Sequence, residues 1–205
     1  MYIYENENNY CELKGILCEE LTYSHESFGE IFYKSSITVK RLSESSDIIK
    51  LIIPENIIKP SEPLRRGDFV TLCGQFRSYN NYSGDGNKLM LSVYVKFIKP
   101  EEETENHNFI LLNGFVCKKP VYRVTPFGRE ITDVLLAVNR LHNKSDYIPC
   151  IFWGKNAKLV SEYDVGDSLK LEGRIQSREY QKKLSEEETV TKTAYEISVS
   201  KIITE

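Results

Sequence analysis

Two aromatic side chains lie six residues apart in an apolar run of the second half of the chain. They are Tyr147 and Trp153, and an even spacing places both on one face of a regular strand, because successive side chains point to opposite faces. Ile148, Cys150 and Phe152 then fall on the other face. One face can therefore be core while the other offers flat rings, which sequence-independent binding of single-stranded nucleic acid needs for stacking on bases.

A later run combines cations with a further aromatic residue. Its apolar positions, from Leu169 to Ile175, alternate with polar ones. The outward positions include, in order, Lys170, Arg174, Gln176, Arg178 and Tyr180. Cations pair with the phosphate that every nucleotide carries. Stacking is worth roughly 1–3 kcal/mol per base, so three rings would dominate the affinity of such a surface.

The sequence carries no pattern typical of catalysis or of metal binding. It has five cysteines and three histidines, with no Cys-x-x-Cys pair, no phosphate-binding glycine loop and no nucleophile motif. An odd number of cysteines without paired spacing favours reduced thiols that pack as small core residues. We therefore expect a protein that is not an enzyme and that has neither a cofactor nor a metal site.

The composition is typical of a cytoplasmic globular protein. The 205 residues include 27 Lys and Arg against 30 Asp and Glu, a net charge of −3, which excludes a polybasic nucleic-acid binder. No apolar run approaches the roughly 20 residues of a membrane span, and the start MYIYENENNY lacks the basic and apolar regions of a signal peptide. We expect a cytoplasmic location and no membrane association.

The chain repeats itself with an offset of 99 residues. From the pair Cys11 and Ile110 to the pair Ser78 and Ser177, without a gap, 19 of 68 pairs are identical, or 28%. Many of the identical positions are glycines and turn residues, which indicates shared backbone geometry. The chain is therefore predicted to contain two copies of one fold.

An acidic segment separates the two copies. It begins at Pro100 and carries four carboxylates in the next five residues, which is typical of a solvated linker. We predict a first domain at 1–99, a linker at 100–106 and a second domain at 107–205. Only the last part is net positive, with 15 basic and 13 acidic residues from 106 to 205.

The second copy is predicted to contain five short strands and one helix. Strands are expected at 109–116, 131–138 and 147–153, a helix at 155–163, and two further strands around 169–176 and 195–199. This order is that of an OB-fold, an all-β Greek-key barrel of five strands, with an SH3-like barrel as the nearest competitor. In the first copy, Pro60 and Pro63 fall where the helix would lie, so the helix is expected to be shortened or absent there.

Three segments of the second copy resemble the bacterial single-stranded DNA-binding protein family. They are LLAVNR at 135–140, DYIPCIFWGK at 146–155 and LEGRIQSR at 171–178, preceded by YRVTP at 122–126. The resemblance covers nearly all of residues 108–203, whereas the first copy shares it mainly through the repeat. It implies an OB-fold that binds single-stranded DNA.

The resemblance also implies roles for individual residues. Positions that match Tyr147, Trp153 and Tyr180 carry stacking aromatics. Those near Arg140, Lys155, Arg174 and Arg178 face the DNA backbone, and Arg123 in the YRVTP segment completes the candidate set. The family often has an aromatic residue at the position of His142, which we interpret here as a loop residue. Three carboxylates at 186–188, in the hairpin between the last two strands, would repel phosphate and argue against tight wrapping of DNA.

The first copy lacks the predicted stacking residues. The 99-residue offset replaces Tyr147 by Ile48, Trp153 by Pro54, Lys155 by Asn56 and Tyr180 by Asn81, whereas Arg41 corresponds to Arg140. Two tyrosines, at positions 79 and 82, flank a predicted hairpin turn at 83–87 and are interpreted as local packing. We expect a degenerate OB domain that serves mainly as an assembly scaffold.

The resemblance further implies how the chain assembles. Relatives with two OB domains per chain form dimers, so we expect a homodimer that presents four OB domains. The chain ends at Glu205 without the acidic, Phe-ended tail of the family, so recruitment of replication or repair enzymes through a tail is not expected.

The sequence favours a non-catalytic binder of single-stranded DNA that acts in replication, repair or recombination. The main alternative is an OB-fold accessory of replication restart or assembly that acts through protein contacts. RNA is a third possible ligand, because the recognition of the 2′-hydroxyl depends on details that the sequence does not contain.

Overall fold

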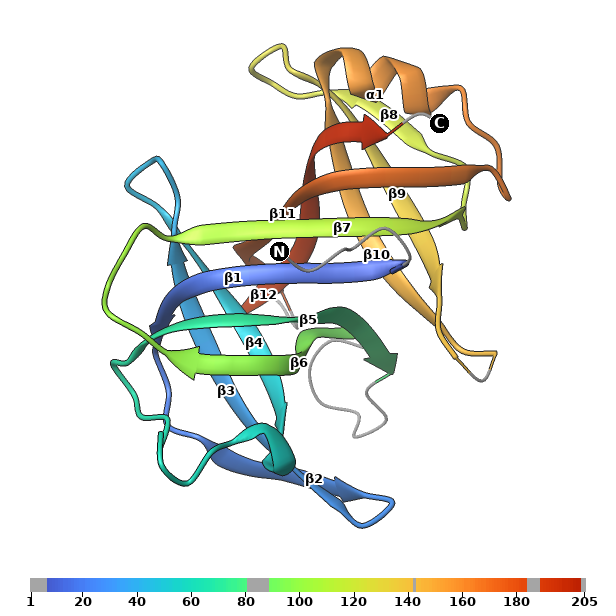
Figure 1. Cartoon of the computed structure of the whole chain (residues 1–205). Coiled ribbons are helices and arrows are strands. Elements are labelled where there is room, and N and C mark those ends of the chain that lie inside the picture. The colour runs from blue at the N-terminus through green and yellow to red at the C-terminus, as the bar shows by residue number, and fades with distance from the viewer. Residues whose placement is uncertain (1–6, 81–88, 142, 184–188, 204–205) are drawn as a thin grey trace.

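The computed structural model describes residues 7–80, 89–141, 143–183 and 189–203, with the side chains of 182 and 183 excepted. The first half contains β1 (Asn9–Leu17), β2 (Thr22–Ser27), β3 (Glu30–Lys40), β4 (Ser46–Pro54), the 3₁₀ turn η1 (Glu55–Ile57), β5 (Phe69–Asn80) and β6 (Leu89–Pro100). The second half contains β7 (His107–Val116), β8 (Val121–Val124), β9 (Glu130–Asn139), β10 (Ser145–Trp153), α1 (Gly154–Ser161), β11 (Ser168–Lys183) and β12 (Thr189–Ile203). Figure 1 shows the two halves one above the other.

Each half closes into a barrel of five strands. In the second half the pairs run β7–β9–β10–β12–β11 and return to β7, and the β10–β12 pair is parallel while the others are antiparallel. The first half repeats this closure as β1–β3–β4–β6–β5, with β4–β6 parallel. This strand order is that of an OB-fold in both halves, and the predicted fold is confirmed.

The predicted strands are present, but the second half contains an additional one. β8 pairs with β9 at the outer edge, and all four of its residues are exposed. A strand this short with no buried side has no alternation for a sequence pattern to reveal. The helix α1 is present, and the first half has only η1 in its place, as Pro60 and Pro63 predicted. The predicted turn at 83–87 and the carboxylates at 186–188 lie outside the described residues.

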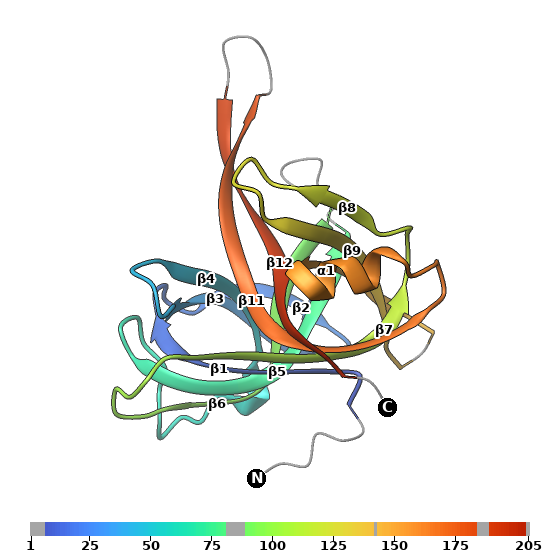
Figure 2. The same ribbon diagram turned by 90° about the horizontal axis from the view of Figure 1, so that it is seen from above.

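The two barrels join through their first strands. β1 pairs antiparallel with β7 and merges the chain into one twelve-stranded sheet, with Cys11 opposite Ile110, the residue 99 positions later. Asn9 bonds both backbone groups of Phe76, at 2.7 and 2.9 Å, and Asn108 does the same to Ile175, at 2.8 and 2.9 Å. The repeats are thus related by an approximate twofold axis. Figure 2 shows β11 and β12 extending beyond their barrel as a long arm.

Glycines shared by the two repeats allow strands to approach closely within each barrel. A Cβ added at Gly15 would collide with the carbonyl oxygen of Thr38, and one at Gly114 would collide with that of Ala137. Both contacts lie where the first strand of the barrel meets the next strand. These glycines are therefore required for barrel closure, which explains their identity across the repeat.

Phe28 and Gly29 form the two-residue turn between β2 and β3. Both have positive φ, 52° and 77°, and a turn of this kind favours Asn followed by Gly. The Phe28 side chain is fully exposed, so packing does not offset the strain of a bulky residue in the left-handed region.

We predict that Phe28→Asn raises the free energy of unfolding by about 1 kcal/mol, because the strain is relieved. Urea denaturation measures this change. The matched control is Phe127→Asn at the equivalent hairpin tip, where the residue is not in the left-handed region. An equal gain in both variants would contradict the explanation.

Candidate nucleic-acid interface

The aromatic residues of β10 lie on the outer side of the second barrel. Tyr147 is 43% exposed and Trp153 is partly exposed, whereas Ile148, Cys150 and Phe152 are buried in the core. The indole Nε1 of Trp153 donates to the Ser198 hydroxyl oxygen at 3.3 Å, which orients the ring beside β12. The predicted alternation holds for the rings and for the core residues, but Ile151, which was expected on the same face as the rings, is buried.

Tyr180 lies on a different part of the barrel surface from Trp153. It is half-buried on β11 and opposite Lys192 of β12, in the arm of Figure 2. Ser198, which holds Trp153, lies six residues further along β12, or roughly 20 Å at the rise of a strand. Tyr180 therefore lies well apart from Trp153 on the surface of the barrel.

Three of the candidate cations already pair with carboxylates. Arg123 Nε bonds Asp133 at 2.7 Å on the surface, and Arg140 Nε lies 3.2 Å from the buried Asp146. Arg174 Nη1 reaches Asp47 of the other repeat at 3.0 Å. These arginines make ion pairs within the protein, so less of their charge is available to phosphate.

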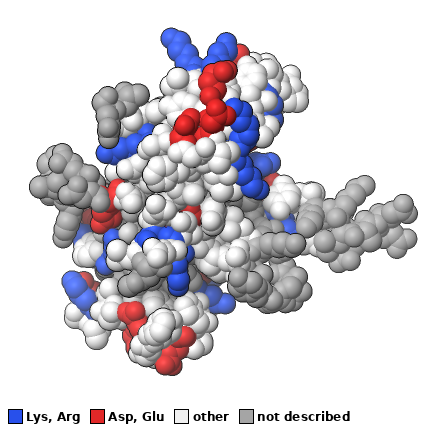
Figure 3. All heavy atoms as spheres, turned by 90° about the vertical axis from the view of Figure 1, so that its right-hand side faces the viewer, with Lys and Arg blue, Asp and Glu red and all other residues white. Residues whose placement is uncertain are grey.

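The other two candidate cations, Lys155 and Arg178, are exposed, on α1 and β11 respectively. His142 lies outside the described residues. Figure 3 shows basic and acidic side chains interspersed on one side of the molecule rather than gathered in one basic band. Stacking therefore has to contribute much of the affinity of this surface.

The candidate set did not include Glu196, which lies on β12 among the candidate cations. It is half-buried opposite Gln176, whose Nε2 donates to its carboxylate at 3.3 Å. Burial raises the pKa of Glu196; Arg178 opposes this shift, and the like charge of Asp133 adds to it. The proximity of Glu196 to Asp133 depends on the barrel geometry.

We predict that Glu196→Gln binds single-stranded DNA about five-fold more tightly at low salt, because it removes a negative charge that would face phosphate. Protonation has the same effect, so the affinity of the unmodified protein should rise as the pH falls from 7 towards 5. The variant should lose most of that rise. Fluorescence anisotropy across this pH range measures both effects, and an equally steep rise in the variant would contradict the assignment.

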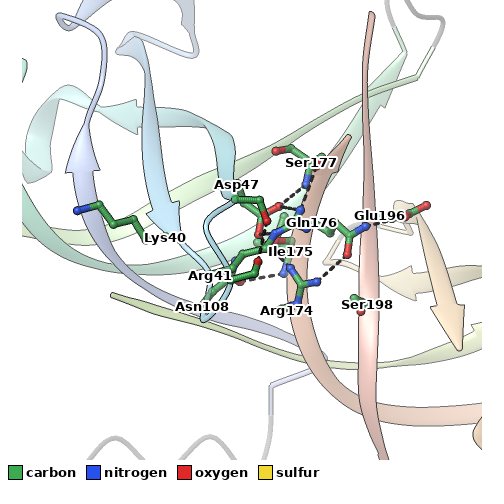
Figure 4. Close-up of polar contacts among 12 residues, drawn as sticks. Lys40, Arg41, Asp47, Asn108, Arg174, Ile175, Gln176, Ser177, Glu196 and Ser198 are labelled. Atoms are coloured by element: carbon green, nitrogen blue, oxygen red, sulfur yellow. Dashed lines mark hydrogen bonds and ion pairs between the residues drawn. The ribbon is translucent and has the colours of Figure 1, made fainter. Parts of the chain in front are cut away.

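The repeats contact each other through a buried carboxylate at the seam between the barrels (Figure 4). Asp47 is 1% exposed and accepts from Arg41 Nε at 2.9 Å, from Arg174 Nη1 at 3.0 Å and from the backbone N–H of Ser177 at 2.8 Å. Burial, with the neighbouring Arg41 charge, lowers the pKa of Arg174. The cluster thus connects β4 of the first repeat to β11 of the second.

The approximate twofold axis repeats this seam contact on the other side. Asp146 accepts from the backbone N–H of Ser78 at 2.6 Å, and the N–H of Tyr147 donates to the Ser78 hydroxyl oxygen at 2.8 Å. Burial raises the pKa of Asp146, and Arg140 and Arg77 oppose that shift. The first repeat therefore fixes the strand end that carries Tyr147.

The outer face of the first repeat is filled by its own side chains. His25 and Phe32 stack at 4.8 Å between ring centroids, Phe32 meets Tyr94 at 6.1 Å, and the Arg77 guanidinium lies 3.9 Å above the Tyr94 ring. Phe32 is opposite Pro54, the counterpart of Trp153. These residues come from four strands, so no local pattern in the sequence predicted their stacking. Rings at this position of the first repeat are therefore packed against one another, whereas Tyr23 and Tyr79 remain exposed elsewhere on that repeat.

Two barrels with the strand order of an OB-fold and an aromatic outer face define a tandem OB-fold protein. Residues 107–203 match the family described as the single-strand binding protein family. The single-stranded DNA-binding proteins of Clostridium tetani and Bacillus cereus are each 36% identical, over 83 and 81 residues, which are 37% and 36% of this chain and 57% and 48% of theirs. The second repeat, residues 107–203, therefore matches the single-strand binding protein family over its whole length.

The matches with these relatives cover only part of each protein. The chain spans about half the length of the curated relatives it matches. The crystal structure of the wild-type single-stranded DNA-binding protein from Thermus aquaticus superposes with a TM-score of 0.76, covering 95% of this chain and 91% of that one at 18% identity. This likeness extends the similarity of fold to both repeats.

The described part of the chain contains neither a cluster of metal-ligating side chains nor a membrane-spanning helix. No three side chains of the types that ligate metals come together there. Within the same residues, no helix has the length and apolar character that crossing a bilayer requires.

Proposed function

We propose that the chain binds single-stranded DNA without catalysis and largely without sequence preference, in replication, repair or recombination. The observation that carries the proposal is the pair of accessible rings, Tyr147 and Trp153, on the outer side of β10 in a closed OB barrel. Rings of this kind stack on any base, while exposed cations such as Lys155 and Arg178 interact with the backbone. The names of the relatives are consistent with this ligand.

Trp153 is the single tryptophan of the chain, so its fluorescence tests the proposal directly. We expect oligothymidylate of about 35 nucleotides, longer than an OB site of ~4–16 nucleotides, to quench the emission, and added salt to weaken the binding. Unchanged emission, together with no binding by anisotropy, would overturn the proposal and favour an accessory that acts through protein contacts.

We further propose that two chains form a homodimer that presents four OB domains. Phe97, Cys73, Glu12 and Phe109 face one another across the adjacent strands β6, β5, β1 and β7. Phe97 on β6 is 42% exposed and Phe115 on β7 is 45% exposed, so this sheet face carries two exposed aromatic side chains. Its position over the approximate twofold axis favours a second copy as the partner.

Light scattering should give twice the chain mass, and Phe97→Glu should shift the measured mass towards that of the monomer. A monomeric unmodified protein would overturn the proposal.

A further inference from the structure

The hairpin turn between β8 and β9 lies beyond the end of β10 that carries Trp153. On β9, Ala137 pairs with Tyr147 and Ile131 pairs with Trp153, six residues apart. Phe127 lies four residues further in the same direction, in the turn between β8 and β9. At the rise of a strand it extends at most about 13 Å beyond the level of Trp153. The tip therefore lies beyond the Trp153 end of β10.

Hydrogen bonds fix the shape of this tip. The N–H of Thr125 donates to the Arg129 carbonyl at 2.8 Å, and the N–H of Gly128 donates to the Thr125 carbonyl at 2.8 Å. The Thr125 hydroxyl oxygen also accepts from the N–H of Arg129 at 3.0 Å. The strand below is tied to the barrel through Glu130, which accepts from the Tyr122 hydroxyl at 2.7 Å and pairs with Lys158 of α1 at 3.0 Å.

The tip holds an aromatic ring and a cation in solvent. The Phe127 side chain is 92% exposed, and Arg129, two residues later, is exposed as well. An exposed phenyl ring on a well-braced turn offers a face for stacking, and the neighbouring guanidinium suits a phosphate. We propose that Phe127 and Arg129 form an additional stacking site for single-stranded DNA beyond the Trp153 end of β10. This inference rests on the proposed function.

The first repeat provides a natural control for the inference. Phe28 occupies the equivalent tip and is also exposed, and the turn between β2 and β3 that carries it lies at the opposite end of the molecule from the turn between β8 and β9 (Figure 1). Its tip is flanked by Glu26 and Glu30 instead of a cation, and its barrel lacks the rings at the positions of Tyr147 and Trp153. Carboxylates repel phosphate, so Phe28 is not expected to contribute to binding.

The test compares Phe127→Ala with Phe28→Ala in the full-length chain, using anisotropy of labelled oligothymidylate of about 35 nucleotides. Phe127→Ala should weaken binding about five-fold or more, the range of one lost stacking contact. Phe28→Ala should bind as the unmodified protein does. Arg129→Ala should reduce the slope of log affinity against log salt by about 0.7, as expected for one lost phosphate contact on a single strand.

Trp153 quenching separates failure of this inference from failure of the proposed function. If the unmodified protein binds and quenches while Phe127→Ala binds equally tightly, the inference is overturned and the proposed function stands. An equal loss in Phe127→Ala and Phe28→Ala would also overturn it, since the flanking charge would then be irrelevant. If the unmodified protein does not bind, the proposed function fails, and with it the inference.

Discussion

Replacement of Trp153 by leucine is expected to weaken single-stranded DNA binding about ten-fold or more. Its ring is partly exposed on the outer side of β10, and the bond from Nε1 to Ser198 holds it in position before DNA arrives. Stacking contributes roughly 1–3 kcal/mol per base, and leucine keeps the apolar volume while removing the π-face. Fluorescence anisotropy measures the affinity, and circular dichroism checks that the barrel remains folded.

Two variants separate stacking from other effects at this position. Trp153→Phe retains a flat ring and should keep most of the affinity. Ser198→Ala removes only the hydrogen bond that orients the indole and should cause a smaller loss. Equal weakening by leucine and phenylalanine would contradict stacking as the cause.

The pairing of cations with carboxylates explains why the rings should matter most. Arg123, Arg140 and Arg174 each contact an aspartate, and two of these aspartates are buried. A phosphate must compete with partners already in place, one of which bridges the two repeats. This surface is therefore better suited to stacking with bases than to binding a DNA backbone through charge alone.

The sequence was sufficient to predict features that depend on local periodicity. The alternation along 147–153 separated the core side of β10 from its accessible side, and Pro60 and Pro63 excluded a helix from the first repeat. The offset of 99 residues predicted two related folds. Each inference required only neighbouring residues or a comparison of the chain with itself.

Features that depend on the closure of the barrels could not be predicted. Arg174 was expected to face DNA, and its contact with Asp47 joins residues 127 positions apart. The stack of Phe32, Tyr94 and Arg77 draws on three strands. Glu196 approaches Asp133 only because β12 lies beside β10, which in turn lies beside β9, the strand of Asp133. Such contacts depend on register and on the approximate twofold axis, neither of which a single strand records.

The seam carboxylate should have the largest effect on stability. Asp47→Ala is expected to lower the free energy of unfolding by about 3 kcal/mol, because it leaves two partly buried guanidinium groups and the N–H of Ser177 without their shared acceptor. For a protein of this size that corresponds to a fall in melting temperature of roughly 6–12 °C. Urea denaturation and calorimetry measure the two quantities.

The matched control for the seam is Asp133→Ala. Asp133 also pairs with an arginine, Arg123 at 2.7 Å, but both side chains are well exposed, so solvent screens the interaction. Its loss should cost no more than about 1 kcal/mol. If the two variants are destabilised equally, burial is not what gives the seam its strength. A much larger loss at Asp47 would mean that the contact between the two repeats depends on this buried carboxylate.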